Sequence, residues 1–529
     1  MPERPASGGV PLVAILATAA VARFWGIRFG LPHPQCRPDE TTIGSVASSI
    51  YHGDLNPHFF NYPALFMVAV AAGLIALLRV GRMLGYYDTE AARPAITETP
   101  TAHLTARVLS ALAGIATVWV LYRTTARLVD RTTALVAAAF LALAFLHVRD
   151  SHFGVTDVAA TFMVVVAFHA IVCFAQSGSP RDMIASAALT GLAAATKYNA
   201  ALVGVPALLT IAGVTRLRPG LRPPWTARFA QAALFAALAV VAFLAASPYS
   251  LLDRTRFLAA LAFESRHLAE GHGLLIGRGW FVHLTSTFRY GLGLPMLAFA
   301  IAGLVWLCAS APRIGVLVAA FPVVYYLILG SGFTVFARYM LPVFPFLCLT
   351  AAYGVTRTGR WIGDLVRRPA WTPALIAVGA GAVLLPSAYS AWQFDRLIAR
   401  TDTRLIAADW VERRWPSGAT LLEIGPEGGH VFPGADSPLH SSRYRLIDLK
   451  PGGPLPDIVV VQSTPLFAPV ELGAAAALLA EKYTVDVEIV GTPPGGPREY
   501  DWQDEFYLPL SGFAGIERPG PNLTLYVPR

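Results

Sequence analysis

Apolar residues gather in long runs along most of this chain. Runs long enough for a membrane-spanning helix lie at 10–29, 106–122, 132–147, 157–175, 229–246, 290–308, 314–330, 339–356 and 372–389. A further run from 184 to 215 is interrupted at Lys197-Tyr198-Asn199, and we interpret it as two short helices that meet at Lys197. The pattern therefore predicts a polytopic α-helical protein with about 11 transmembrane helices.

Arginines between the runs predict the orientation of the chain. They form three clusters, made of Arg123, Arg127 and Arg131, of Arg216, Arg218, Arg222 and Arg228, and of Arg357, Arg360, Arg367 and Arg368. Loops rich in arginine stay on the cytoplasmic side of a membrane.

The orientation of one apolar segment, 62–80, is ambiguous. If this segment crossed the membrane, the first arginine cluster would lie outside, against the rule. Arg79 and Arg82 argue mildly for a crossing. We predict that 62–80 lies along the outer leaflet as a juxtamembrane helix within an outer loop at 30–105. The N-terminus is then cytoplasmic and the C-terminus is extracytoplasmic.

The composition supports a membrane protein and excludes other classes. The 529 residues are 55% hydrophobic and only 14% charged, and the mean hydropathy is +0.53, which is too apolar for a soluble chain. The net charge of +8 follows from the arginine loops and indicates orientation rather than nucleic-acid binding. The four cysteines show no disulfide or zinc-ligand spacing. The first apolar run has no convincing small-residue cleavage site before Arg37, so we expect a retained span. The expected location is a bacterial-type plasma (inner) membrane.

The composition changes after the last apolar run, which divides the chain into a membrane domain at 1–389 and a second domain at 390–529. A helix is predicted over Thr401–Trp415 and another over Glu471–Lys482. Strands are predicted at Ala419–Ile424, Tyr444–Leu449, Asp457–Gln462, Tyr483–Val490 and Leu523–Val527. We expect a small extracytoplasmic α/β domain, and its own apolar strands suggest that 400–529 folds independently.

Two adjacent carboxylates, Asp39 and Glu40, follow the first apolar run. Pro38 pushes Arg37 into an extended conformation, so the carboxylates open a new segment. An acidic pair at a helix start also suits the helix dipole. The predicted topology, however, gathers the acidic pair with further polar residues on the outer face, namely Arg149, His152, Asp157, Lys197 and Arg338. Ionisable groups at a membrane boundary are candidates for a functional site.

These polar residues lie in motifs that resemble the C-type membrane glycosyltransferases, and most closely the protein O-mannosyltransferase branch with its bacterial lipopolysaccharide and aminoarabinose transferase relatives. In chain order the motifs are Asp39-Glu40, 61–65 (NYPAL), 107–112 (RVLSAL), 149–157 (RDSHFGVTD), 191–199 (GLAAATKYN), 247–249 (SPY) and 338–342 (RYMLP). The family's usual second proline in the first-loop motif is Ala64 here. The resemblance extends from about residue 10 to 389. Each motif is loose by itself, and the order and spacing of the motifs make the resemblance specific.

The resemblance implies an inverting transfer of a sugar from a polyprenyl-phosphate donor to a hydroxyl acceptor on the outer face. An attacking hydroxyl needs a base, and Asp39 matches the family's position for it; Glu40 would orient the acceptor or hold a divalent cation. Asp157 would contact the sugar or the acceptor. The departing lipid phosphate needs cations, for which Lys197 and Arg338 are the first candidates. Arg149, His152, Arg266 and His267 are weaker ones.

The expected partners are the lipid-linked donor, membrane lipid and a glycan, lipid or protein acceptor. No nucleotide-binding fold is needed, because the donor arrives in the bilayer, and no Gly-rich phosphate loop or dinucleotide fingerprint is present in the sequence. A divalent cation is the one cofactor that the sequence leaves room for.

Two rival interpretations remain open at this point. A transporter or lipid flippase would place charged groups near the midplane, often with internal repeats, whereas the charges here gather at one face and no repeat is visible. A non-catalytic assembly factor would tolerate the loss of Asp39. Lys197 could also be a helix-end lysine that reaches the interface, Arg338 a boundary arginine, and His152 a hydrogen-bonded polar residue.

Overall fold

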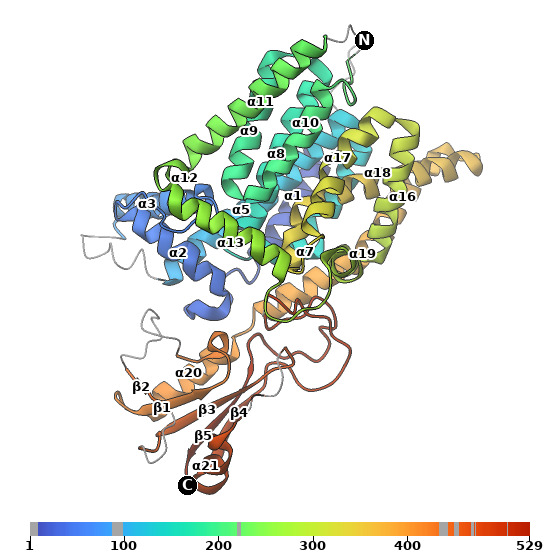
Figure 1. Ribbon diagram of the computed structural model, residues 1–529. Helices are drawn as coiled ribbons and strands as arrows, with labels where there is room; N and C mark the ends of the chain where they lie inside the picture. Colours follow the sequence, from blue (N-terminus) through green and yellow to red (C-terminus); the bar gives the residue numbers. More distant parts are fainter. Residues whose placement is uncertain are drawn as a thin grey trace.

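A helical body and a smaller domain built on a β-sheet make up the computed structural model of the chain (Figure 1). The structure describes residues 9–86, 99–218, 224–432, 443–448, 454–466, 470, 472–504 and 506–529. The sheet domain lies at one end of the helical body, and the C-terminus lies at the far end of the sheet domain (Figure 1).

Every apolar run predicted to span the membrane contains a helix. The helices in the first half of the body, within those runs and between them, are α1 (Gly9–Phe24), α2 (Pro38–Tyr51), α3 (Leu65–Met83), α5 (Thr99–Leu128), α6 (Arg131–Ala142), α7 (Phe145–Asp150), α8 (Thr156–Ser177), α9 (Pro180–Thr196) and α10 (Gly204–Ile211). In the second half they are α11 (Trp225–Ala246), α12 (Tyr249–Leu252), α13 (Arg254–Glu270), α14 (Gly279–Val282), α15 (Arg289–Leu292), α16 (Leu294–Ser310), α17 (Pro312–Leu329), α18 (Phe344–Leu365) and α19 (Thr372–Ile398).

Short 3₁₀ and π segments connect several of these helices. They are η1 (Pro34–Cys36), η2 (Tyr198–Val203), η3 (His283–Phe288), η4 (Ala337–Val343) and η5 (Pro369–Trp371). The predicted break at Lys197 is confirmed: α9 ends at Thr196, Lys197 is extended with φ −154° and ψ 128°, and η2 begins at the next residue.

Among the described residues, seven helices are long and apolar enough to cross a membrane, or eight if the pair of helices bent by 110° at Gly293 counts as one span. Three other apolar helices, at Val10–Phe24, Arg131–Ala142 and Tyr198–Ile211, are shorter. The chain is thus an integral membrane protein by the length and composition of its helices, while the total of about 11 crossings remains a prediction.

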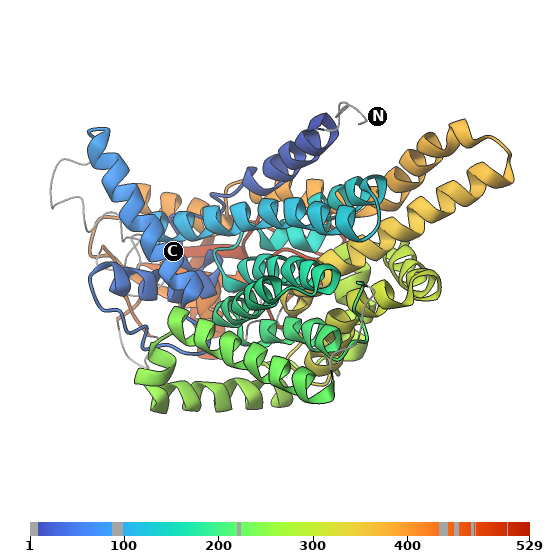
Figure 2. The same cartoon turned by 90° about the horizontal axis from the view of Figure 1, so that it is seen from above.

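Helix α3, predicted to lie along the outer leaflet, satisfies the length and composition of a span. It packs on α2 and α5 and lies beside α2 at the end of the body that faces the sheet domain (Figures 1 and 2). Its buried side chains, which include Phe66, Val70 and Leu74, follow one face of the helix. The placement of 62–80 along the outer leaflet remains a prediction, because α3 has the length and composition of a span.

The arginine-rich connections meet at one end of the helical body. Arg127 Nε donates to Gln176 Oε1 at 2.7 Å, Arg218 Nη1 donates to the carbonyl oxygen of Ser177 at 2.9 Å, and Arg360 Nη2 contacts Asp130 Oδ2 at 2.9 Å. Arg222 lies outside the described residues. The 22 residues of α8 separate this end from Asp157 by about 33 Å, which is close to the thickness of a bilayer core.

The C-terminal domain contains the predicted mixture of helices and strands. Its elements are α20 (Thr403–Arg414), β1 (Thr420–Ile424), η6 (Glu427–Gly429), β2 (Arg445–Leu446), β3 (Ile458–Ser463), α21 (Ala474–Lys482), β4 (Tyr483–Ile489) and β5 (Asn522–Pro528). The sheet order is β2-β1-β3-β5-β4, with β2, β1 and β3 parallel and β5 antiparallel to both of its neighbours. Leu449 and Glu471, which end one predicted element and start another, lie outside the described residues.

The two domains share a core. The boundary predicted at 389/390 falls within α19, which continues to Ile398. Phe506 and Phe513 pack inside the helical body, where the Phe506 ring lies 5.1 Å from Phe153 and the Phe513 ring lies 5.7 Å from Phe145. This packing argues against the expectation that 400–529 folds on its own, because separation would expose these rings to water.

Candidate active site

A pocket of about 390 Å³ lies where the helical body meets the C-terminal domain. Its polar lining comes from the start of α2, from α13, from η4 and from the C-terminal domain, and comprises Arg37, Asp39, Glu264, His267, Arg338 and Asp504. The pocket therefore brings together charged residues that are far apart in the sequence.

Asp39 reaches the pocket because of the local sequence that starts α2. Arg37 is extended and precedes the helix, Pro38 occupies its first turn, and Asp39 follows one residue later. An acidic residue there suits the positive end of the helix dipole. The Asp39 side chain is 32% exposed, and its Oδ2 lies 2.9 Å from Arg338 Nη2 and 4.0 Å from Arg37 Nη2. Asp39 is thus a carboxylate held by cations and open to a substrate.

Glu40 points away from the pocket and is fully buried. Its oxygens accept hydrogen bonds from Arg107 Nε at 2.9 and 3.0 Å, from Arg107 Nη2 at 2.7 Å and from the backbone N–H of Gly154 at 2.6 Å. Arg107 Nη1 donates to the carbonyl oxygens of Ile27 and Phe29. The Glu40–Arg107 ion pair thus joins α2 to α5 and to the loops at Ile27–Phe29 and Gly154. Glu40 therefore stabilises the fold and is not accessible to a substrate.

Arg338 lies in η4, directly before α18, and its guanidinium group bridges two carboxylates. Nη2 contacts Asp39 and Nη1 donates to Asp504 Oδ1 of the C-terminal domain. The Arg338 guanidinium carbon also lies 4.4 Å from the centre of the Phe336 ring. These contacts fix the orientation of a planar, five-donor group.

Lys197 lines a neighbouring pocket of about 160 Å³ and forms a second ion pair with the buried Asp157. Lys197 Nζ lies 2.5 Å from Asp157 Oδ1 and 4.7 Å from the centre of the Tyr339 ring. Tyr62, Glu264 and Tyr339 line both pockets. The Asp39–Arg338 pair and the Lys197–Asp157 pair therefore lie at neighbouring pockets that share these three lining residues.

The weaker sequence candidates are distributed around the site. Arg149 is buried behind it, where Nη1 contacts Asp150 Oδ2 at 3.1 Å and Nη2 contacts Asp504 Oδ2 at 3.2 Å. His152 is also buried, with its ring nitrogens 3.0 Å from the carbonyl oxygens of Val148 and Trp25, and burial lowers its pKa to about 4. His267 lines the larger pocket, whereas Arg266 is exposed on α13 and does not.

Sequence reasoning missed Asp504, which accepts contacts from three arginines at once. Burial alone would raise the pKa of this carboxyl, but the guanidinium groups of Arg338, Arg37 and Arg149 lower it to about 2. Its neighbour Asp501 has a raised pKa, because it is buried and lies near the negative charge of Asp504. The sequence offered one signal that could have identified Asp504. The polar residues of 501–504 lie between aromatic residues in a region that is otherwise rich in Gly and Pro.

No group of three or more His, Cys, Asp or Glu side chains that could hold a metal ion occurs among the described residues. Asp39 and Glu40 diverge into separate environments. The divalent cation that the sequence left room for remains a prediction.

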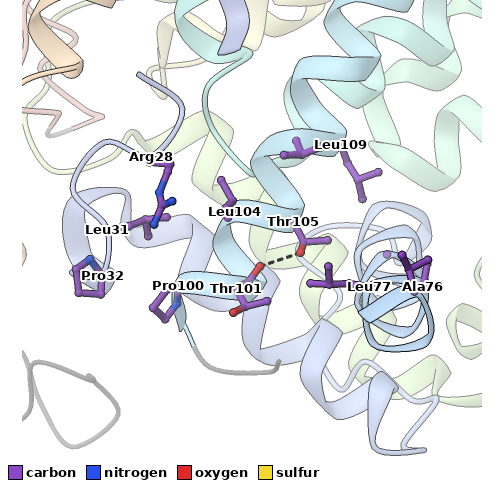
Figure 3. Close-up of a pocket in the computed structure, with 13 residues that line it drawn as sticks. Arg28, Leu31, Pro32, Ala76, Leu77, Pro100, Thr101, Leu104, Thr105 and Leu109 are labelled. Atoms are coloured by element: carbon purple, nitrogen blue, oxygen red, sulfur yellow. Dashed lines mark hydrogen bonds between the residues drawn. The ribbon is translucent and has the colours of Figure 1, made fainter. Parts of the chain in front are cut away.

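A larger groove of about 870 Å³ opens between α3 and α5 (Figure 3). Its lining is mostly apolar, with Leu77, Leu104 and Leu109 facing the opening and Arg28 at its edge (Figure 3). None of the predicted site residues lines this groove, so the smaller pocket at Asp39 is the candidate reaction site.

The fold is that of the C-type membrane glycosyltransferases. The crystal structure of ArnT from Cupriavidus metallidurans bound to undecaprenyl phosphate matches with a TM-score of 0.57 and 14% identity over 98% of each chain. The apo structure of the same protein matches with a TM-score of 0.57 and 14% identity, over 99% of this chain and 98% of that one. The apo oligosaccharyltransferase of Archaeoglobus fulgidus gives a TM-score of 0.49 and 13% identity, over 78% of this chain and 62% of that one.

Residues 100–249 match the family model described as dolichyl-phosphate-mannose-protein mannosyltransferase. This segment contains Arg107, Asp157 and Lys197, whereas Asp39 and Arg338 lie outside it. No curated protein matches the chain. The resemblance to C-type membrane glycosyltransferases that the motifs predicted is thus confirmed by an independent family match and by the fold.

Proposed function

We propose that the protein is an inverting glycosyltransferase that moves a sugar from a polyprenyl-phosphate donor to a hydroxyl group of an envelope glycan, lipid or protein. The reaction takes place on the extracytoplasmic face of a bacterial-type inner membrane. The observation that carries the proposal is the Asp39 carboxylate, which faces a pocket and is held by Arg338 beside the Lys197–Asp157 pair.

Asp39 acts as the general base. The acceptor hydroxyl attacks the anomeric carbon of the donor sugar and gives its proton to the Asp39 carboxylate. The bond from the anomeric carbon to the phosphate oxygen breaks at the same time, and its electron pair leaves with the lipid phosphate. Attack opposite to the leaving group inverts the anomeric carbon. Both cation contacts of Asp39 use Oδ2, which leaves Oδ1 for the acceptor.

Lys197 and Arg338 stabilise the departing phosphate. Each lies in a wall of a pocket, and each is less than a tenth exposed by its residue surface. A cation that is largely removed from water interacts more strongly with a developing negative charge. The shared wall of Tyr62, Glu264 and Tyr339 separates the lysine from Asp39, so the donor phosphate and the acceptor hydroxyl would approach from neighbouring pockets.

The remaining sequence candidates support this arrangement without touching the reacting atoms. Glu40 holds the start of α2 through Arg107, and Asp157 orients Lys197. Arg149 secures Asp504, and His152 joins the loop before α8 to the end of α1. We propose positioning roles for these four residues.

Mass spectrometry of envelope glycans and lipids tests the proposal in cells that make the protein, its Asp39→Asn variant or no protein. A sugar-bearing species that depends on the wild-type protein and is lost in Asp39→Asn cells is the expected result. Asp54→Asn is a matched control, because Asp54 is 53% exposed in the same outer loop and pairs with His58. Equal glycan profiles in the wild-type and Asp39→Asn cells would overturn the proposal. A flippase would predict this second result.

A further inference from the structure

The C-terminal domain contributes one carboxylate to the pocket of the helical body. Asp504 is only 2% exposed, and its oxygens lie 2.9 Å from Arg37 Nη2 and 3.2 Å from Arg149 Nη2, in addition to the close contact with Arg338 Nη1. Three guanidinium groups from three different segments of the helical body thus meet at one acidic side chain of the other domain.

Two neighbours of Asp504 fix its loop to the backbone at the entry of η4. Asp501 Oδ2 accepts from the N–H of Ala337 at 2.9 Å, and Gln503 Oε1 accepts from the N–H of Val335 at 2.6 Å. Gln503 Nε2 donates to the carbonyl oxygens of Phe333 and Leu274 at 3.0 Å each. The loop is therefore held to the backbone that leads into Arg338, which fixes the position of Asp504 relative to the pocket.

Arg338 uses its two terminal nitrogens on two different carboxylates. Nη2 contacts Asp39 and Nη1 contacts Asp504. An arginine beside a single carboxylate tends to form two parallel hydrogen bonds to both of its oxygens. Without Asp504, Arg338 would be free to turn and engage both oxygens of Asp39, and the acceptor would then lose its proton-accepting site.

A simple role as an interdomain clamp would account for the burial of Asp504 but not for the shared guanidinium group. Asp501 and Gln503 already anchor the same loop through backbone groups alone, and Phe506 anchors it through aromatic packing. Asp504 differs from these residues because it contacts a cation that itself touches the proposed base.

We propose that Asp504 is a positioning residue of the transferase site: it holds one arm of Arg338 and thereby keeps Oδ1 of Asp39 free for the acceptor hydroxyl. The inference rests on the proposed function, and it makes the C-terminal domain a part of the active site. It predicts that loss of Asp504 lowers turnover without weakening the binding of a lipid phosphate. Loss of Asp504 removes a negative charge from a cationic pocket, so binding of a lipid phosphate is retained or becomes tighter while turnover falls.

The test uses the purified full-length protein in detergent, with two measurements on each variant. Binding is measured with undecaprenyl phosphate. Turnover is measured as undecaprenyl phosphate released from undecaprenyl-phosphate mannose or aminoarabinose in the presence of an envelope lipid extract. We expect Asp504→Asn to lower turnover by about 10- to 100-fold, as for a misplaced general base, with affinity for undecaprenyl phosphate unchanged or higher. The melting temperature of each variant reports on folding.

Three further variants separate positioning from folding. Asp486→Asn is the control, because Asp486 is an acidic residue of the same domain that pairs with Arg414 and does not line the pocket, and its turnover should stay within about threefold of wild type. Asp504→Glu keeps the charge and should recover part of the turnover. The double variant Asp504→Asn/Arg338→Gln should be no slower than Arg338→Gln, since Asp504 acts through Arg338.

The outcomes distinguish failure of the positioning role of Asp504 from failure of the proposed transferase function. Parallel losses of binding and turnover in Asp504→Asn, or full turnover in that variant, would overturn the positioning role. Additive losses in the double variant would do the same. If Asp504→Asn does not fold, Asp504→Glu must show the separation of turnover from binding, and its absence there counts against the inference. A wild-type protein that neither binds undecaprenyl phosphate nor releases it would instead refute the proposed function.

Discussion

Asp39 and Glu40 are adjacent in the sequence but have opposite environments. Successive residues of a helix point about 100° apart, so the first turn of α2 directs Asp39 to the pocket and Glu40 to Arg107. One side chain is 32% exposed and the other is fully buried. The acidic pair that the sequence offered as one unit thus divides into a partly exposed carboxylate, which we propose as the base, and a buried carboxylate that holds Arg107.

Glu40→Gln should destabilise the protein, whereas Asp39→Asn should not. Removing one partner of a buried ion pair leaves an uncompensated charge and costs about 3 to 5 kcal/mol. Arg107 would be that charge, since three of its contacts are to Glu40. Melting temperatures of the two purified variants measure the difference. A Glu40→Gln protein as stable as wild type would contradict the structural role.

Lys197→Ala should weaken use of the lipid-phosphate donor. A lost hydrogen bond to a charged group costs about 10- to 100-fold in kcat/KM, and Lys197→Arg should restore only part of it, because a guanidinium group differs in shape from an ammonium group. Lys482→Ala, at the exposed end of α21, is the matched control. The double variant Lys197→Ala/Asp157→Asn avoids an unpaired buried Asp157. Unchanged kinetics in both variants that lack Lys197 would assign the phosphate to other cations.

The residues that the sequence could identify are those at the ends of apolar runs. Lys197 interrupts such a run, Arg338 directly precedes one, and Asp39 lies in the loop that follows the first one; an ionisable group at a membrane boundary has a high desolvation cost that needs an explanation. Asp504 could not be found in this way, because it lies in an irregular segment of the other domain. The packing of Phe506 and Phe513 into the helical body, together with the hydrogen bonds of Asp501 and Gln503, brings it to the arginines.

At the scale of elements, the charged side chains of the proposed site come from residues at the starts of helices and at breaks between them. Lys197 is the extended residue between α9 and η2, Arg338 lies in the 3₁₀ segment before α18, and Asp39 starts α2. Backbone that leaves the regular helix can aim a side chain into a cavity, which is how irregular segments are used inside membrane proteins. The sequence predicted two of these positions, through Pro38 and through the polar interruption at Lys197, but it did not predict the 3₁₀ segment at Ala337–Val343.

Glu423 on β1 gives the C-terminal domain a predicted pH dependence. Its side chain is 3% exposed, and burial raises its pKa from 4.5 to about 7 despite hydrogen bonds from the N–H groups of Val431 and Phe432. The folded state prefers the protonated form, so stability is full below pH 4.5 and falls by about 3 kcal/mol as the pH rises to 7.

Glu423→Gln should remove this loss. Hydrogen exchange of backbone amides in 419–432 should be slower in the variant than in wild type at pH 8, and equal in the two proteins at pH 5. Glu427→Gln, an exposed neighbour in η6, should change neither value. Faster exchange in Glu423→Gln at pH 8 would show that the charged form stabilises the fold.

At the scale of the whole molecule, the arginine-rich connections and the proposed site occupy opposite ends of the helical body. The arginine-rich connections gather at one end. The C-terminal domain, which lines the Asp39 pocket through Asp504, lies at the other end (Figure 1). The sequence could predict this separation, because the positive-inside rule and the apolar runs act on the whole chain. It could not predict that the two domains share a core, since α19 and the Phe506 loop carry no signal of domain contact.

Thiol labelling in intact cells tests this orientation. In a variant whose four cysteines are replaced by alanine, a cysteine at Asp54 should react with a membrane-impermeant maleimide, because Asp54 lies on the side of the pocket and is 53% exposed. A cysteine at Arg127 should react only after the cells are opened. The opposite pattern would place the pocket in the cytoplasm and remove the basis for an extracytoplasmic reaction.

The central claim is that Asp39 accepts the proton of the attacking hydroxyl. Its most direct test is the rate of a single turnover by purified full-length protein that has been loaded with an undecaprenyl-phosphate sugar and mixed with acceptor. We predict that Asp39→Asn lowers this rate by about 100- to 10,000-fold, while its melting temperature and its affinity for undecaprenyl phosphate stay near those of wild type and of Asp54→Asn. A single-turnover rate in Asp39→Asn within a few-fold of wild type would contradict the account.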